Sequence, residues 1–151
     1  MQEAEKQIYS HERYYLSEGK EGMSAKIQRE LIAELTLEKR TVPGLLFEDC
    51  TVSGCHFIDT DLYGSLFADC IFEDCVFEGC NINKASFFGC EIRDSLFEDC
   101  RLIKTEFPAG SFRNVTFTRC DLSRASFIRA KGRGVSVNDC DDKDCGISAI
   151  L

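Results

Sequence analysis

Several features that would favour a disordered, membrane or secreted protein are scarce in this chain of 151 residues. It holds only eleven glycines and two prolines, and 44% of its residues are hydrophobic, so a wholly disordered chain is excluded. No apolar run approaches the roughly 18 residues that a membrane helix needs. The first twenty residues also lack the apolar core of a signal peptide. We therefore expect a soluble cytoplasmic protein that makes no contact with a membrane.

Residues that carry catalysis or bind metals are scarce as well. The two histidines, His11 and His56, are predicted to be surface residues, and the sequence has no nucleophile motif, phosphate-binding loop or HExxH-type helix. Paired carboxylates occur at Glu73-Asp74 and Glu98-Asp99, but a convex surface offers no cleft to raise their pKa values. We expect no enzymatic activity, no cofactor and no metal site.

Positively charged residues are scarce in the middle of the chain. Residues 45–100 hold twelve acidic residues against Lys84 and Arg93, a net charge of −10. Residues 101–133 hold eight basic residues against Glu106 and Asp121, a net charge of +6. The whole chain has a net charge of −8, which argues against direct nucleic-acid binding, because phosphate contacts need lysine and arginine.

What the chain has in abundance is cysteine and phenylalanine, both in a strict order. All ten cysteines stand at multiples of five, and most of the remaining residues in that column are small. Two positions further on, a second column holds a large apolar residue at all 17 positions from Phe47 to Phe127, including eleven of the twelve phenylalanines. The residues between the columns are mostly charged, polar or glycine.

This five-residue period predicts a solenoid between about residues 45 and 129. In an extended segment, side chains two residues apart point to the same side. The small and the large residue of each repeat therefore both point inward. A period of five matches neither a helix nor a continuous strand, so the chain must turn a corner in each repeat. A chain that turns repeatedly in one sense winds into coils, which stack about 4.8 Å apart.

Stretches such as CIFEDCVFEGCNINKASFFGCEIRDSLFEDC make the sequence resemble the pentapeptide repeat family, over about 85 of the 151 residues. The resemblance implies four repeats per coil and an all-β, right-handed quadrilateral β-helix. Seventeen repeats would then give a little over four coils and a prism about 20 Å tall.

The segments outside the repeat are interpreted as caps. We expect a polar arm at 1–22, a capping helix and linker at 23–44, the β-helix at 45–130, and an irregular last coil with a C-terminal cap at 131–151. The amphipathic helix is placed at roughly 24–39, because Ile27, Leu31 and Leu35 follow a helical spacing after Ser24. The alternative is a helix that binds a partner. The C-terminal end either caps the solenoid or forms a homodimer interface.

The cysteines are interpreted as small core residues. Five-residue spacing is not that of zinc ligands. Disulfides between adjacent coils are feasible by distance, but inward thiols in apolar surroundings are more often inert.

Function must then reside on the outer surface. If residues twenty apart lie one above another, Lys84, Lys104 and Arg124 form a basic ladder joined by Arg101. An acidic patch on the next two sides contains Glu73, Asp74, Glu78, Asp94, Glu98 and Asp99. Apolar residues also stack, in one row of Phe88, Pro108 and Ile128 and in another of Val76 and Leu96.

Two functions fit these surfaces. The first is a non-enzymatic scaffold that binds a protein partner, such as a bacterial toxin, effector or secretion component. The second follows from the family resemblance, which implies a DNA-mimicking modulator of DNA gyrase or another type II topoisomerase. The short prism and the basic segment at 101–133 argue against the second.

Overall fold

A computed structural model describes all residues from 1 to 151, and its backbone turns a corner at every fifth residue. Each residue at five-residue intervals from Arg29 to Asp144 has a positive φ, which makes twenty-four corners. Side chains disfavour this left-handed conformation, and Asp, Asn and Gly tolerate it best. These three residue types occupy fifteen of the corners. The polar residues between the inward columns therefore include the residues that turn the chain.

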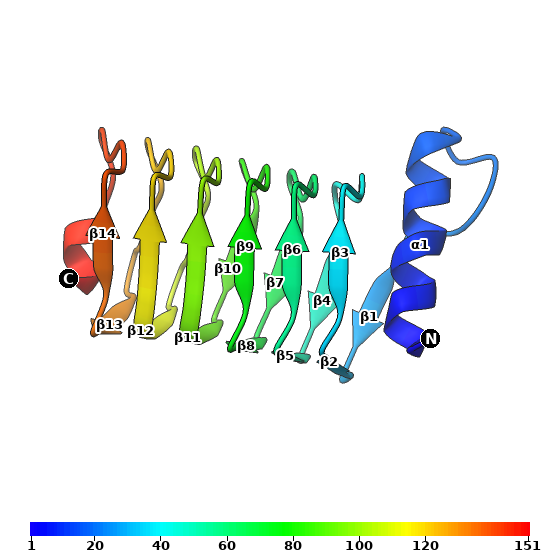
Figure 1. Cartoon of the computed structure of the whole chain (residues 1–151), viewed down its shortest axis with the longest axis horizontal. Coiled ribbons are helices and arrows are strands. Elements are labelled where there is room, and N and C mark those ends of the chain that lie inside the picture. Colours follow the sequence, from blue (N-terminus) through cyan, green and yellow to red (C-terminus); the bar gives the residue numbers. More distant parts are fainter.

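The corners bring residues twenty apart into parallel register, as in the pairs Ile27–Phe47 and Phe47–Phe67. With four corners in each twenty-residue coil, twenty-four corners make six coils. The protein is the solenoid that the five-residue period predicted, with the four sides and the right hand that the family resemblance implied, and Figure 1 shows its coils stacked along one axis. It has six coils rather than four, because the repeat also includes residues before 45 and after 129.

The four sides are named here first to fourth face, in chain order. The first face holds β1 (Lys26–Gln28), β4 (Leu46–Glu48), β7 (Leu66–Ala68) and β10 (Ser86–Phe88). The second face holds β2 (Leu31–Ala33), β5 (Thr51–Ser53), β8 (Ile71–Glu73), the first parts of β11 (Glu91–Glu98) and β12 (Ser111–Thr118), and β13 (Lys131–Arg133). The third face holds β3 (Thr36–Glu38), β6 (His56–Ile58), β9 (Val76–Glu78), the second parts of β11 and β12, and β14 (Ser136–Asn138). The fourth face is joined by single bridges such as Asn81–Arg101.

The core consists of the two inward columns. Phenylalanine rings stack along the axis, with centroids 4.7 Å apart for Phe77–Phe97 and 4.9 Å for Phe97–Phe117. A second stack runs from Phe67 through Phe87 to Phe107 at 4.8 and 4.9 Å. The small residue of each repeat leaves room for these rings, and no buried side-chain N or O atom lacks a hydrogen-bond partner.

The predicted helix at 24–39 is wrong. Those residues form β1, β2 and β3 of the first coil, and Ile27, Ile32 and Leu37 continue the large inward column. The spacing of Ile27, Leu31 and Leu35 suggested a helix because the small column is interrupted here by Glu30, Leu35 and Arg40. Leu31 points outward and is 65% exposed, which a helix face packed on the solenoid would not allow.

The helix lies instead in the segment predicted to be a polar arm. Helix α1 (Glu3–Leu16) covers the open end of the first coil, at the right of Figure 1. Ala4, Ile8 and His11 form its buried stripe, at the spacing of a helix face. The side chain of Glu12 accepts hydrogen bonds from the Arg40 side chain at 2.9 Å and from the Thr41 backbone at 2.8 Å. The cap is thus held by apolar and charged contacts.

The last coil is more regular than predicted. Strands β13 and β14 continue the parallel register with β12 before η1 (Ile147–Ile150) closes the chain. A Cβ at Gly132 would clash with the backbone and side chain of Ile150, which is buried. The large column therefore fails at Gly132 because the terminal turn packs there. Val135, Val137 and Cys140 at this end are half-buried.

Candidate interaction surfaces

The ten cysteines are free thiols of the core. Eight are buried, and Cys140 and Cys145 in the last coil are half-buried. The thiols of all but Cys145 donate hydrogen bonds to backbone carbonyls, as from Cys80 to Phe57 at 3.1 Å and from Cys100 to Phe77 at 3.2 Å. Burial raises the pKa of the Cys140 and Cys145 thiols, so even the most accessible thiols are weak nucleophiles. The chain holds no group of three or more His, Cys, Asp or Glu side chains arranged to bind a metal ion.

One histidine lies where the sequence did not place it. His56 is exposed, as expected, but His11 is buried, so its prediction as a surface residue is wrong. Its Nδ1 accepts a hydrogen bond from the Ala25 backbone at 2.9 Å, so Nε2 carries the proton and donates to the Pro43 carbonyl at 2.7 Å. His11 therefore joins helix α1 to both ends of the first coil and has a structural role.

The apolar row of Phe88, Pro108 and Ile128 lies on the first face. Phe88 pairs in register with Ala68, and the bridges Ser86–Glu106 and Glu106–Ser126 continue that register to Ile128. Phe88 is 49% exposed and Ile128 is 61% exposed. A shallow hollow beside Ile128 is lined by Arg124, Ala125, Ser126, Phe127, Asp144, Gly146 and Ala149. The row and the hollow form one apolar strip that reaches the C-terminal end.

The acidic patch is divided between the second and third faces and is partly neutralised. Arg93 contacts Glu73 at 2.9 Å, and Arg119 contacts Glu98 at 3.2 Å and Asp99 at 2.9 Å. The Asp94 carboxylate accepts a hydrogen bond from Asn114 at 3.1 Å. Two further members of the patch, Asp74 and Glu78, make no ion pair. The patch is therefore a mixed surface rather than a continuous negative one.

The basic ladder follows the corner at the end of the fourth face. Lys84, Lys104 and Arg124 all have positive φ values there, at 59°, 57° and 58°. None of the three forms an ion pair, and the Lys84 ammonium lies 5.9 Å from the centroid of the Tyr63 ring. Arg101 lies on the same face at its opposite edge, since it pairs with Asn81 and Asp121. The ladder exposes three unpaired cations.

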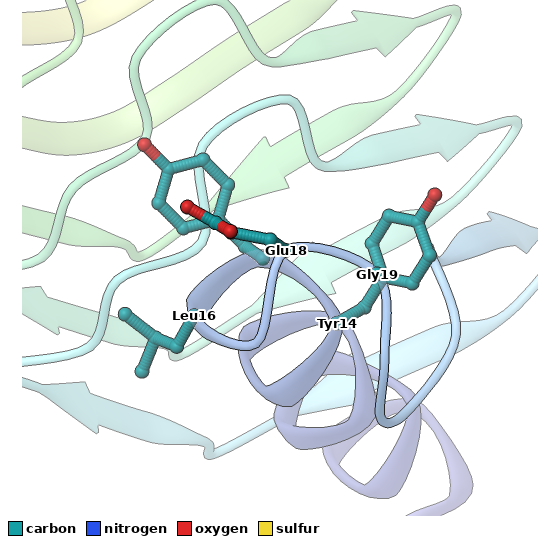
Figure 2. A pocket seen from close by; sticks show the side chains of 5 residues that line it. Tyr14, Leu16, Glu18 and Gly19 are labelled. Carbon is teal, nitrogen blue, oxygen red and sulfur yellow. The ribbon is translucent and has the colours of Figure 1, made fainter.

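A surface hollow at the end of helix α1 was not predicted. Figure 2 shows it between Leu16 on one side and Tyr14 with Gly19 on the other, with Glu18 between them. Tyr15 and Leu16 are 51% and 63% exposed. Three of the four tyrosines fall in the first 22 residues, which was the only sequence signal for it. The hollow has one charged group, Glu18, and no cluster of polar side chains directed into it.

The fold and these surfaces define a class of protein, a repeat solenoid with an apolar core and a decorated exterior. A family model described as "Pentapeptide repeat region" matches residues 50–127, which is more than half of the chain. The chain belongs to the pentapeptide repeat family.

Three solved structures are similar to this chain, and the first two of them are described as pentapeptide repeat proteins. Rfr23 from the cyanobacterium Cyanothece 51142 is 10% identical, with 91% of this chain and 97% of that chain covered and a TM-score of 0.48. A protein from the thylakoid lumen of Arabidopsis thaliana is 13% identical, with 64% and 67% covered and a TM-score of 0.44. Full-length QnrB1, a plasmid-mediated fluoroquinolone resistance protein, is 14% identical, with 84% and 91% covered and a TM-score of 0.37.

No curated protein matches the sequence. No helix of the structure is long and apolar enough to span a membrane.

Proposed function

We propose that this protein is a non-enzymatic scaffold that binds a protein partner through its outer faces. The observation that supports this most is the apolar strip on the first face. Its two largest members, Phe88 and Ile128, are about half exposed or more, although the other eleven phenylalanines are all buried. Exposed apolar rows of this kind are typical of protein–protein contact. The partner would present apolar side chains to this strip.

The test uses the protein as bait in lysate of its own host. The double variant Phe88→Glu/Ile128→Glu should lose a protein that wild type captures, because two carboxylates would be buried against an apolar partner. Thr116→Glu on the third face is the matched control, since it adds charge at a half-buried outward position away from the strip. Equal capture by wild type and the double variant, or no specific capture by wild type, would contradict the proposal.

A second candidate function is a DNA-mimicking modulator of DNA gyrase or another type II topoisomerase. It is favoured by the net charge of −10 over residues 45–100 and by six aspartates at corners of that segment, Asp49, Asp59, Asp69, Asp74, Asp94 and Asp99. Six coils are about 24 Å from first to last, which corresponds to about seven base pairs. The ion pairs of Arg93 and Arg119 interrupt the negative surface, so we rank this function second.

A supercoiling assay with purified gyrase tests this second function. Inhibition or protection at micromolar protein, lost on Asp74→Lys/Asp94→Lys, would support it. Unchanged supercoiling at that concentration would exclude it.

The C-terminal end is a candidate contact for a second copy of the chain. Strands β13 and β14 have no strand beyond them, and η1 lies against β13. Val135 and Val137 remain partly open there, so an end-to-end homodimer would bury apolar surface and unpaired backbone groups. Replacement of Val137 by Lys should abolish such a dimer in light scattering.

A further inference from the structure

The second face carries a charge dipole that lies entirely within four consecutive coils. Its third and fourth coils hold Glu73, Asp74, Glu91 and Asp94 against Arg93, a net charge of −3. Its fifth and sixth coils hold Arg113, Lys131 and Arg133 and no acidic residue, a net charge of +3. The two halves of this flat face thus carry equal and opposite net charges.

The strand register fixes the order of these side chains. One outward column runs Ile71, Glu91, Ser111, Lys131, and the other runs Glu73, Arg93, Arg113, Arg133. Within a column neighbours are joined by backbone pairing, so the charges cannot change their order. The face is therefore a fixed pattern of two columns and four rows.

The two halves differ in how far the chain itself satisfies their charges. Arg93 lies 2.9 Å from Glu73 and 3.6 Å from Glu91, so the acidic half already shares one cation. Arg113, Lys131 and Arg133 are exposed and form no ion pair. The three cations of the basic half therefore have no anionic partner within the chain.

The pattern is complementary to itself under a two-fold rotation. The axis is perpendicular to the face and lies between its fourth and fifth coils. The fourth coil of one copy then meets the fifth coil of the other, the third coil meets the sixth, and the two columns exchange. Glu91 then faces Arg113 of the other copy, and Glu73 faces Lys131. Arg93 faces Ser111, and Arg133 faces Ile71 beside the corner residue Asp69. No two like charges face each other directly, although the face carries eight charged residues in these four coils.

We propose that the second face is a self-association surface, on which two copies of this chain pack antiparallel through their acidic and basic halves. An isologous contact requires this kind of self-complementary patch. The footprint is about 19 Å by 13 Å, roughly 250 Å² per copy, against about 800 Å² in a stable interface. The complex is therefore weak and salt-sensitive, and it should form only at high protein concentration and low salt.

The dimer would cover Glu73, Asp74 and Asp94 of the acidic patch and leave the apolar strip of the first face open. It does not depend on the proposed scaffold function. Loss of self-association with partner capture intact would separate the two proposals.

The first test is a pair of charge reversals followed by sedimentation equilibrium over a concentration series at low and high salt. Arg113→Glu places Glu91 opposite a glutamate, and Glu91→Arg places Arg113 opposite an arginine. Each should weaken association at least about tenfold, because like charges then meet in both halves of the contact. The chain with both reversals restores two opposite-charge contacts and should return to within about threefold of wild type.

The decisive test mixes the two single variants. A copy with Arg113→Glu and a copy with Glu91→Arg have opposite charges at both contacts, so they should associate with each other although neither associates with itself. Arg124→Glu is the matched control, because it reverses a charge in the same coil on the fourth face. It should leave association unchanged.

Three results would overturn the proposal. Wild type could remain monomeric at low salt even at about 1 mM protein, a concentration at which a contact of about −4 kcal/mol would already be half formed. Association could be insensitive to Arg113→Glu while Val137→Lys abolishes it, which would indicate contact through the C-terminal end. The mixed single variants could also fail to associate with each other.

Discussion

A phenylalanine has one of two environments in this protein, and its position in the repeat decides which. Phe97, at an inward position, is fully buried, and its ring stacks between those of Phe77 and Phe117. Phe88 follows an inward residue and is half exposed on the first face. Phenylalanine thus packs in the core at eleven positions and is exposed on the surface at one.

The replacement Phe97→Ala should lower the free energy of unfolding by about 3–5 kcal/mol, because it removes a buried ring from a continuous stack and leaves a cavity. Phe88→Ala is the matched control and should change it by less than about 1 kcal/mol. Urea denaturation followed by circular dichroism measures both. Similar losses for the two variants would contradict the assignment of Phe97 to the core and Phe88 to the surface.

The reactivity of the thiols tests the burial of individual cysteine side chains. Because burial raises the pKa of Cys140 and Cys145, a smaller fraction of each is thiolate at a given pH than for an ordinary thiol. Iodoacetamide should therefore modify the folded protein at pH 8 far more slowly than the urea-unfolded protein. The rate at these two residues should keep rising above pH 9, where a free thiol is largely ionised. Mass spectrometry of the labelled peptides measures the rate, and rapid labelling of Cys80 or Cys100 at pH 8 would contradict the buried core.

At the scale of elements, the two ends of the solenoid are closed by different means. Helix α1 covers the first coil with three buried residues and the contacts of Glu12, whereas the last coil is covered by the four-residue η1. The N-terminal cap depends on His11, which connects it to Ala25 and Pro43. The stability of each end therefore depends on a small number of residues.

Replacing His11 with Ala should destabilise the N-terminal end by about 1–3 kcal/mol, because the buried Ala25 amide loses its acceptor. Hydrogen exchange should speed up in the first coil, at residues 25–44, and stay unchanged in the middle coils. The control is the variant His56→Ala, because His56 is exposed. An equal increase in the exchange rate in all coils of the His11→Ala variant would mean that the cap does not act locally.

Gly132→Ala tests the other end. The added Cβ would meet the carbonyl and side chain of Ile150, so η1 must move away from β13. Faster exchange at residues 147–151, with the first coil unaffected, is the expected result. Gly64→Ala provides the comparison, since nothing lies within 4 Å of its Cβ position, although its φ of 64° adds local strain there.

At the scale of the whole molecule, the sequence predicted the solenoid because two columns with one period are sufficient to define it. It did not predict the first coil, since Glu30, Leu35 and Arg40 hide the small column and leave a pattern that also fits a helix. Helix α1 was missed because only Ala4, Ile8 and His11 form its buried stripe, and one of these is polar. The twenty-residue interval places Lys84, Lys104 and Arg124 one above another, and it does the same for Phe88, Pro108 and Ile128, but Arg101 lies at the opposite edge of the fourth face and does not join the ladder. The ion pairs of Arg93 and Arg119 depend on side-chain conformation, which the repeat does not specify.

The twenty-residue register also determines which changes in length the protein can absorb. An insertion of one residue would turn every later inward residue outward, and an insertion of five would move each later repeat to the next face. Removal of residues 65–84 would instead shorten the prism by one coil and keep every remaining side chain on its own face. The change in length that keeps every face unchanged is therefore one full coil, and an insertion of another length must leave the solenoid as a loop at a corner or lie at one of the two capped ends.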